Sequence, residues 1–503
     1  MVKKIFAIGI VCIILFMGLS NASSIKHKTA AQNTITVDDE ENDGDYTSIQ
    51  DAINVANDGD IIEVYSGTYY ELISIDKQII LKGIDSELGS GNDIGNPVID
   101  NEYTSTEPII KVKANNVEIT GFIIEDFHKW RDSSGIKITS DDNKIMYNVI
   151  RKTKGSHGGS AIWISGRTNN EIAYNEIYSL PETHTVIYNG IEIEGGYNNI
   201  VHHNIIRDVS CGVHFNILYS DLQEIFPKDN KVYRNNFLRS SFHLKGYDNL
   251  ASENYFEKDG MVMNFEDCHH NIIYRNNFYN YENGIWIWDA VNNDIIENNF
   301  INSDAYFLLV KNIYFDEDLK NNWDRNYWNE PRILPYAIEG EWYIVTGGPT
   351  FKGYRYDNHP ANELYTIPTG ANQKPSKPST PDGPNSGIQN TSYTYTCSGA
   401  DPDTHHLYYL FDWGDDSNSG WIGPYNSGEV CEASHSWTEK GNYNIIVKTK
   451  DIYDYESEWS NPLTLSMPKN KATTTHIMRF KQNNPYIFRI LQQLLQRLEI
   501  QSL

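Results

Sequence analysis

The stretch Asn143-Lys-Ile-Met-Tyr-Asn148-Val-Ile150 decides the fold, because its pattern returns along the chain. In each copy an Asn is followed two residues later by an apolar residue, and a second Asn begins the same pattern five residues after the first. The other copies begin at Asn170, Asn199, Asn230, Asn249, Asn271 and Asn293. The second Asn residues of the last four copies are 19, 22 and 22 residues apart. A period of about 20 residues is typical of a solenoid.

Apolar and polar residues alternate within each copy, which predicts short strands with one face inside the solenoid and the other in solvent. A helical repeat would need apolar residues three and four positions apart, a spacing that these copies lack. Stacked Asn amides can form hydrogen-bonded ladders between coils, and Asn tolerates the left-handed backbone expected at the bends. The repeat therefore predicts an all-β solenoid.

Both ends of the repeat region carry candidate caps. Thr47-Ser-Ile-Gln50 is a capping box, and it predicts a short helix near 47–57 that covers the first open end. The aromatic region 313–370 is expected to close the other end.

With these repeats the chain resembles the secreted prokaryotic proteins with NosD-like, or carbohydrate-binding and sugar-hydrolysis, repeats of the pectate-lyase-like superfamily. The resemblance covers residues 36–370 and implies a right-handed parallel β-helix over 36–312. That scaffold hosts lyases, hydrolases, epimerases, adhesins and metallocentre maturation factors, so the resemblance implies a fold rather than one activity. The name NosD suggests copper, but 7 Met residues without a Met/His cluster offer no soft-ligand site.

The C-terminal part has a different composition. Residues 371–384 are rich in Pro and predict a stiff linker. The segments Phe411-Asp-Trp-Gly-Asp415 and Ser434-His-Ser-Trp437 resemble a polycystic-kidney-disease (PKD) type module, which implies an immunoglobulin-like β-sandwich over 385–468. The basic tail 469–503 predicts an amphipathic helix with Ile487, Ile490, Leu491, Leu494, Leu495 and Leu498 on one face. That face would contact the protein itself, a membrane surface or another protein.

The chain has five cysteines. Cys397 and Cys431 fall in neighbouring predicted strands, so a disulfide between them is expected outside the cell. Cys211 and Cys268 are expected to be buried thiols. The CxxC spacing of a structural zinc site is absent.

The compartment and the charge narrow the possible partners. Lys3 and Lys4 precede an apolar run that ends at Leu19, and small residues follow up to Ala22, so residues 1–22 predict a cleaved signal peptide. We therefore expect a secreted, extracellular or cell-surface protein. A formal net charge of -26 argues against nucleic acid as a partner, because phosphate binding needs clustered Lys and Arg.

One strand in each coil precedes the first Asn, and aligning these strands predicts two columns of outward side chains. The first column contains Lys137, Trp163, Glu192, His214, His243, Asn264 and Trp286. The second contains Thr139, Ser165, Glu194, Asn216, Lys245, Glu266 and Trp288.

These columns predict a sugar-binding wall. At ~4.8 Å per coil, Trp163 and Trp286 would lie about 24 Å apart, roughly the reach of a short oligosaccharide. Indole rings stack on the faces of sugar rings, while polar neighbours bind hydroxyl groups. The expected substrate-binding residues are Trp163, His214, His243, Lys245, Glu266, Trp286 and Trp288. Covering of these aromatic residues by loops or by the second domain is the alternative.

Catalysis and metal binding are further possibilities on the same wall. Glu192 and Glu194 would point the same way with Cα atoms ~6.5–7 Å apart, which suits an acid and a base of a hydrolase. Two carboxylates on one strand are also typical of a solvated face. Lys137 is a candidate base for a lyase. No cofactor is predicted, although His214 and His243 beside Glu192 could bind a divalent metal.

Three functional hypotheses follow. The first is a carbohydrate-binding surface protein that uses the outer wall. The second is a polysaccharide hydrolase or lyase on the same wall. The third is a purely structural or adhesive protein, for which Trp163, Trp286 and Trp288 would be buried under loops.

Overall fold

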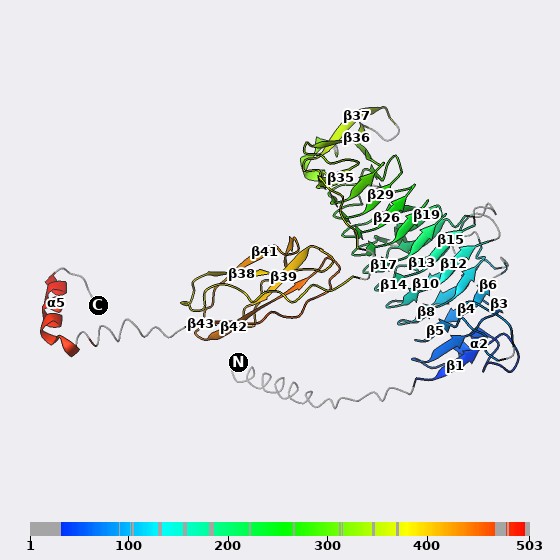
Figure 1. Ribbon diagram of the computed structural model, residues 1–503, viewed down its shortest axis with the longest axis horizontal. Helices are drawn as coiled ribbons and strands as arrows, with labels where there is room; N and C mark the ends of the chain where they lie inside the picture. Colours follow the sequence, from blue (N-terminus) through cyan, green and yellow to red (C-terminus); the bar gives the residue numbers. More distant parts are fainter. Residues whose placement is uncertain are drawn as a thin grey trace, which may run out of the picture. The chain divides into compact units, whose positions relative to one another are not determined.

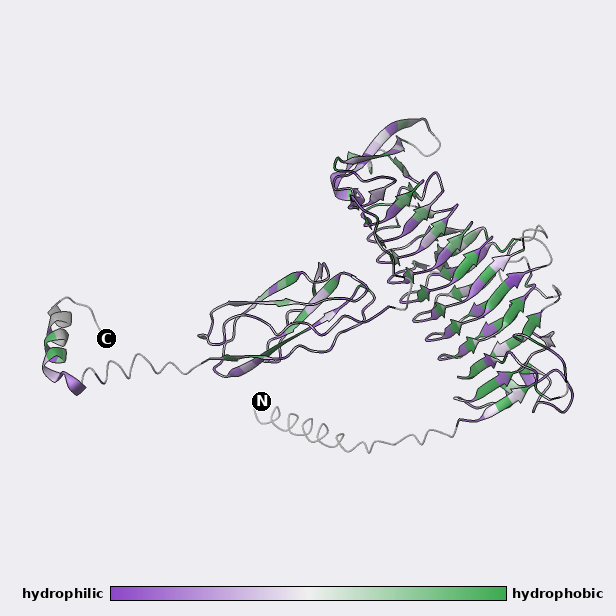
Figure 2. Cartoon of the chain, viewed as in Figure 1, coloured by the Kyte–Doolittle hydropathy of each residue, from purple (hydrophilic) through white to green (hydrophobic). Residues whose placement is uncertain are grey.

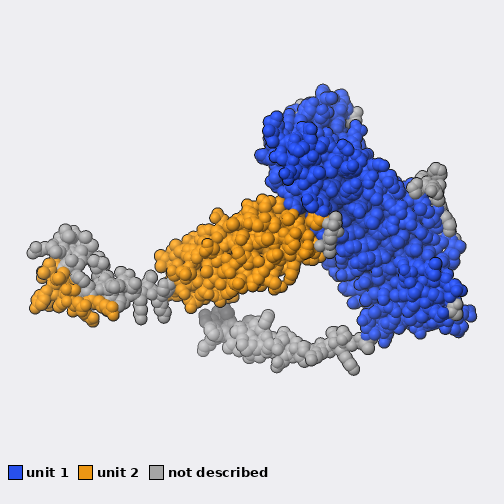
Figure 3. Space-filling model, in the orientation of Figure 1, with its two compact units in different colours: residues 1–367 blue, residues 368–503 orange. Residues whose placement is uncertain are grey.

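The computed structural model describes residues 32–497 apart from gaps at 90, 101, 103–104, 129–132, 154–157, 181–185, 221–222, 265–266, 311–312, 314, 345–347, 369–371, 468–478 and 480–481. The expected signal peptide, residues 1–22, therefore lies outside the described residues. The chain divides into two compact units, residues 1–367 and 368–503 (Figure 3). Among the described helices, none has the length and apolar character needed to span a bilayer.

The first unit is a parallel β-helix in which most coils give one strand to each of three sheets (Figure 1). The first sheet contains β1 (Thr34–Val37), β2 (Ile61–Val64), β5 (Ile80–Gly83), β8 (Glu118–Thr120), β11 (Lys144–Met146), β14 (Glu171–Ala173), β17 (Ile200–His202), β22 (Lys231–Tyr233), β25 (Leu250–Ser252), β28 (Ile272–Tyr274), β31 (Asp294–Ile296) and β34 (Asn322–Asp324). The third sheet contains β3 (Thr68–Tyr69), β6 (Val98–Asp100), β9 (Ile123–Glu125), β12 (Val149–Lys152), β15 (Glu176–Ser179), β18 (Ile205–Arg207), β23 (Asn236–Leu238), β26 (Tyr255–Glu257), β29 (Asn277–Tyr279), β32 (Asn299–Ile301) and β35 (Tyr327–Trp328).

The second sheet, called the wall sheet below, carries the predicted columns. It contains β4 (Ile73–Ile75), β7 (Ile110–Val112), β10 (Ser134–Ile138), β13 (Ser160–Ser165), β16 (Asn189–Glu194), β19 (Cys211–Asn216), β24 (Ser241–Leu244), β27 (Met261–Asn264), β30 (Ile285–Trp288), β33 (Ala305–Val310), β36 (Tyr336–Tyr343) and β37 (Thr350–Asp357). A small antiparallel hairpin of β20 (Leu218–Ser220) and β21 (Gln223–Ile225) follows β19.

Inside the coil, each apolar side chain stacks on a similar side chain of the next coil. Parallel in-register pairing produces this arrangement, because it places equivalent residues one above another. Ile145, Ile172 and Val201 pair in sequence along the first sheet and are fully buried. In the third sheet, the rings of Phe237, Phe256, Phe278 and Phe300 stack with centroids 4.7 to 5.0 Å apart. The alternation of hydrophobic and hydrophilic residues along the strands is visible in Figure 2.

The predicted Asn ladders are confirmed. In each ladder the side-chain amide of one coil donates to the amide oxygen of the next coil, at distances of 2.9 to 3.2 Å. The first ladder runs through Asn143, Asn170, Asn199, Asn230, Asn249, Asn271, Asn293 and Asn321. The second runs through Asn148, Asn175, Asn204, Asn235, Asn254, Asn276, Asn298 and Asn326.

The expectation that these Asn residues themselves adopt left-handed backbone is wrong. In the seven predicted copies, the residue before each ladder Asn has a positive φ, between 51° and 61°. Tyr147, Arg234 and Glu253 are examples. The ladder Asn must direct its amide inward to reach the next coil, so the preceding residue makes the bend. The left-handed conformation is unfavourable for residues other than Gly. Hydrogen bonds on both sides of each bend hold these residues in it.

A short helix, α2 (Ile49–Val55), lies at the first end and buries Ile49, Ala52 and Ile53. Its N-cap is Ser48 rather than Thr47, and the Ser48 hydroxyl accepts from the Asp51 N–H at 3.2 Å. The Gln50 side-chain oxygen accepts from the Ser74 N–H at 2.7 Å instead of completing the predicted capping box. The Glu71 carboxylate accepts from the first two helical N–H groups, those of Ile49 and Gln50, both at 2.9 Å.

The coils continue past the expected boundary at residue 312. β33, β34 and β35 pair in parallel with the preceding coil, and Asn321 and Asn326 extend both ladders. Asp357 ends the second ladder by accepting from the Asn326 amide at 3.1 Å and from the Trp328 indole N–H at 3.0 Å. The antiparallel hairpin β36–β37 and a short 3₁₀ helix, η2 (Glu317–Leu319), complete this end.

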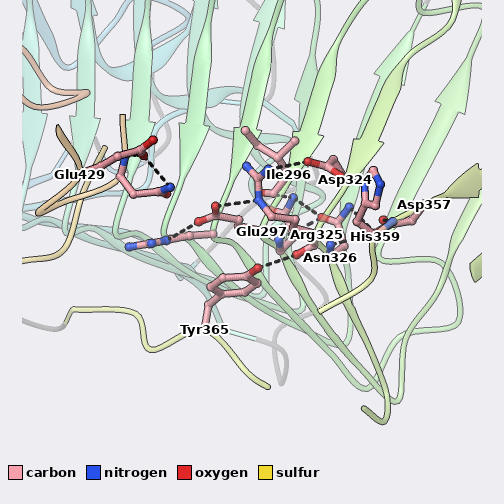
Figure 4. Close-up of polar contacts among 12 residues, drawn as sticks. Ile296, Glu297, Asp324, Arg325, Asn326, Asp357, His359, Tyr365 and Glu429 are labelled. Carbon is pink, nitrogen blue, oxygen red and sulfur yellow. Dashed lines mark hydrogen bonds and ion pairs between the residues drawn. The ribbon is translucent and has the colours of Figure 1, made fainter. Parts of the chain in front are cut away.

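An ion-pair chain lies at the bends beside this cap (Figure 4). Glu297 accepts from Arg275 at 3.0 Å and from Arg325 at 3.2 Å. Arg325 also pairs with Asp324 at 2.6 Å, and its carbonyl accepts from the Tyr365 hydroxyl at 2.8 Å. The segment that follows the hairpin is thereby fixed to the last coils.

The second unit is a β-sandwich. One antiparallel sheet contains β38 (Tyr393–Ser398) and β41 (Val430–His435). The other contains, in spatial order, β40 (Ile422–Tyr425), β39 (Leu407–Asp412), β42 (Asn442–Lys450) and β43 (Leu463–Ser466). Its separate core includes Trp413 and Trp437. The expected linker is part of this unit, because the main chain of Asp382 exchanges two hydrogen bonds with Thr396 of β38.

Cys397 and Cys431 are directly opposite each other in the β38–β41 pair. The structure holds both as free thiols, and the Cys397 thiol donates to the Ser379 carbonyl at 3.2 Å. Their disulfide therefore stays a prediction. Cys211 and Cys268 are buried free thiols, as expected.

The tail contains α5 (Pro485–Arg497), and Ile487 and Ile490 on it are exposed. Leu498 of the predicted apolar face lies outside the described residues.

Candidate functional site

The outward face of the wall sheet follows the predicted first column over its first five strands. Lys137 pairs with Trp163 and Trp163 with Glu192. Glu192 pairs in turn with His214, and His214 with His243.

The predicted first column is wrong by two residues at β27. His243 pairs with Val262, not with Asn264, and Asn264 pairs with Trp288 in the second column. Met261 and Met263 are the inward residues, at 1% and 0% exposure, so Gly260 is the residue that corresponds to the Gly of the other strands. Glu266, the expected second-column residue, lies outside the described residues.

Trp163 offers no open face to a ligand, in contrast to the expected exposed platform. Its indole is only 5% exposed. The ammonium of Lys137 lies 3.6 Å from the ring centroid, a cation–π contact that covers the ring. Lys137, the candidate base, therefore contacts Trp163, the candidate stacking residue.

Glu192 and Glu194 are closed off from solvent, at 2% and 5% exposure. The Glu192 carboxylate accepts from the Ser160 hydroxyl at 2.7 Å and from the Asn189 amide at 3.0 Å. A Cβ atom on Gly195, next to Glu194, would lie 2.6 Å from the Leu218 Cβ, so the β20–β21 hairpin packs against this end of the wall. Their predicted acid and base roles would require an opening of this region.

The imidazoles of His214 and His243 contact each other edge to face, with centroids 5.5 Å apart. His214 Nδ1 is 3.2 Å from the Asn189 amide oxygen. Burial, and secondarily the charge of Lys245, lowers the pKa of His243, and burial lowers the pKa of Lys245. Both groups are half-buried in the middle of the wall.

An exposed aromatic strip lies on the same face at the last strands. Trp286 of β30 is 45% exposed and pairs with the half-buried Tyr306 of β33. On β37, Tyr354 and Tyr356 are 42% and 53% exposed and pair with Glu339 and Ala337, on the outward face of β36. We call Trp286, Tyr306, Tyr354 and Tyr356 the aromatic strip; it spans about 14 Å over three strand spacings.

Polar groups border the aromatic strip. Glu339 is exposed and Glu341 is half-buried on β36, between Tyr306 and β37. Burial, followed by the charge of Glu341, raises the pKa of Tyr306. Trp288 is half-buried and pairs with Asn264. The strip therefore combines flat apolar faces with the carboxylate acceptors of Glu339 and Glu341.

Within the described part of the chain, four groups of three residues place potential metal ligand atoms within 4.8 Å of one another. They are Asp38/Asp39/Glu40, Glu40/Glu87/Asp93, Asp100/Glu125/Asp126 and Asp401/His405/Asp451. His214 and His243 belong to none of these groups.

Sequence reasoning placed Trp286 and Trp288 on the wall but missed Tyr306, Tyr354 and Tyr356. Tyr306 lies in the predicted β-helix but outside the seven aligned strands, and Tyr354 and Tyr356 lie in the region 313–370 that the sequence predicts to be a cap. The pairing of β36 with β37 has no repeat signature, so only the structure brings Tyr354 and Tyr356 beside Tyr306.

Comparisons with known proteins give a family match within the first unit and a similarity to a PKD domain. Residues 134–312 match the family model of the right-handed β-helix region. A comparison with curated proteins finds no match. The PKD domain of a peptidase from a Thermoplasmatales archaeon is 43% identical over 20% of this chain and 100% of that chain, with a TM-score of 0.19.

Two further solved structures are similar to longer parts of the chain. A mutant tailspike protein of E. coli bacteriophage HK620, in complex with a pentasaccharide, is 8% identical over 84% of this chain and 80% of that chain, with a TM-score of 0.31. The A-module of a mannuronan C-5 epimerase from Azotobacter vinelandii is 11% identical over 56% of this chain and 72% of that chain, with a TM-score of 0.20. Such scores carry no argument about activity. The family match and the stacked parallel sheets together identify the first unit as a right-handed parallel β-helix.

Proposed function

We propose that this chain is a secreted or cell-surface carbohydrate-binding protein that binds a glycan along the aromatic strip of its β-helix. The observation that carries the proposal is the 45% exposure of Trp286 in line with Tyr306, Tyr354 and Tyr356 on one face of one sheet. Large aromatic groups in solvent forgo burial worth about 25 cal/mol per Å². Contiguous exposed apolar groups of this kind mark binding surfaces.

The geometry of the strip suits a chain of sugar rings. Trp286 and Tyr306 lie on neighbouring strands about 4.8 Å apart, and Tyr354 lies two strands beyond Tyr306, with Glu339 of β36 between them. The carboxylates of Glu339 and Glu341 can accept hydrogen bonds from hydroxyl groups beside these faces. Because both are acidic and the whole chain carries a net charge of -26, the proposed ligand is a neutral rather than an anionic glycan.

The remaining parts of the chain fit a role outside the cell. Residues 1–22 would direct secretion, and the second unit would act as a PKD-type spacer or adhesion module. The alternative is a polysaccharide hydrolase or lyase that uses Glu192, Glu194 or Lys137 on the same sheet.

The test is a polysaccharide array with the purified protein, followed by affinity measurement and product analysis for each bound glycan. We expect Trp286→Ala and Tyr354→Ala each to weaken binding about fivefold, because one aromatic contact contributes about 1 kcal/mol. Tyr147→Ala is the matched control, since Tyr147 is 57% exposed at a bend away from the strip.

The outcomes separate the three hypotheses. Loss of binding in the strip variants without release of products supports the proposal. New reducing or unsaturated chain ends would establish the enzyme instead. Equal binding by Trp286→Ala and the unmutated protein would overturn the aromatic strip as the site, and the absence of any bound glycan would favour a structural role.

A further inference from the structure

Two acidic loops meet at the N-terminal end of the β-helix, far along the sheets from the aromatic strip. One follows β1 and has the sequence Asp38-Asp-Glu-Glu-Asn-Asp-Gly-Asp45. The other follows β5 and contributes Glu87 and Asp93. Neither 38–45 nor 85–95 contains a Lys or an Arg.

The carboxylates of these loops converge. Ligand oxygens of Asp38, Asp39 and Glu40 lie within 4.8 Å of one another, and so do those of Glu40, Glu87 and Asp93. Glu40 belongs to both groups and joins them. Backbone also approaches closely: a Cβ atom on Gly91 would lie 2.3 Å from Glu87 Oε1 and 2.7 Å from Glu40 Oε1. A side chain at residue 91 would therefore fill the space between the two carboxylates.

The burial of Asp38 favours a bound cation. Asp38 is 0% exposed, and its Oδ2 atom is buried without a hydrogen-bond partner. Glu40 Oε2 and Glu87 Oε1 are likewise buried without a partner. Carboxylate oxygens in such positions are costly unless a cation or a donor satisfies them.

The charge of the cluster points the same way, because carboxylates that converge this closely repel one another when no positive charge lies among them.

We propose that Asp38, Asp39, Glu40, Glu87 and Asp93 bind a calcium ion that joins the two acidic loops. All the donor atoms are oxygens, whereas zinc in proteins is bound mainly through the nitrogen of His and the sulfur of Cys. The donor set therefore argues against zinc. The irregular arrangement of side chains from two loops suits calcium, which accepts six to eight oxygens in flexible geometry, better than magnesium, which demands a strict octahedron. The ion would hold the loop after β1 against the loop after β5 and so stabilise the cap that covers the first coil.

The experiment measures hydrogen exchange and thermal unfolding of the full-length protein in EDTA, CaCl₂ and MgCl₂. Calcium is expected to slow exchange in segments 38–45 and 85–95 at least tenfold and to raise the first unfolding temperature. Glu40→Gln should bind calcium at least tenfold more weakly, as read from the calcium concentration at half protection. Glu63→Gln is the control, because Glu63 pairs with Lys82 on neighbouring strands outside the cluster.

A folding defect is distinguished from loss of the ion by the measurements in EDTA. There Glu40→Gln should unfold at or above the temperature of the unmutated protein, because one repelling charge is gone, whereas in CaCl₂ it should unfold below it. Unchanged exchange in both segments at saturating calcium would overturn the proposal. So would a normal calcium response of Glu40→Gln, and equal protection by magnesium at the same concentration would overturn the assignment to calcium.

Discussion

Polar residues on the surface of this solenoid contact polar residues one coil away. Glu171 on β14 illustrates this. His202 Nε2, one coil further, lies 3.0 Å from Glu171 Oε1, and Lys144 Nζ, one coil earlier, lies 3.2 Å from Oε2. A carboxylate that contacts groups on both sides contributes to stability only while it is ionised.

The pKa of Glu171 predicts an acid-dependent loss of stability. The hydrogen bond with His202, supported by Lys144, lowers this pKa from 4.5 to about 2. As the pH falls from about 4.5 to about 2, the unfolded chain takes up the proton before the folded protein does, so stability falls. Urea unfolding at about pH 5 and about pH 3 should show a smaller decrease for Glu171→Gln than for the unmutated protein. Identical decreases would contradict the predicted role of Glu171.

At the scale of the element, the strands of the first and third sheets are too short to be stable alone, and many have only three residues. The ladders join them. Asn254 accepts from the Asn235 N–H and amide, both at 3.0 Å, and donates to Asn276 at 3.0 Å and to the Val232 carbonyl at 2.8 Å. Each ladder Asn therefore serves main-chain and side-chain groups of its neighbours.

We predict that Asn254→Ala destabilises the β-helix by about 2 to 4 kcal/mol, because several buried groups lose their partners. Asn322→Ala is the matched control: its amide donates to Asp294 at 2.9 Å in an exposed pair, so its effect should stay within about 0.5 kcal/mol. Denaturant unfolding measures both. Since solenoids unfold by coils, exchange should rise first in the coils around β26. Equal stability of the two variants would show that the inner ladder adds little.

The whole molecule consists of two units with separate hydrophobic cores, one filled by stacked Ile and Phe residues and the other by Trp413 and Trp437. Each core is large enough to support its own cooperative transition. Calorimetry of the full chain should therefore show at least two transitions, and a fragment of residues 368–467 should unfold at the temperature of one of them. Loss of structure in that fragment would mean that the sandwich depends on the β-helix.

The sequence by itself determined the coiled architecture, because a repeat every coil specifies parallel pairing and places Asn143, Asn170 and their equivalents in ladders. Local pattern was enough here, since each coil contacts only its neighbours. Only the tertiary structure decided the site. Burial of Met261 and Met263 set the register at β27, the ammonium of Lys137 covered Trp163, and the β36–β37 hairpin brought Tyr354 toward Trp286. These outcomes depend on side chains that meet across coils and hairpins without a shared period, and no local pattern encodes such contacts.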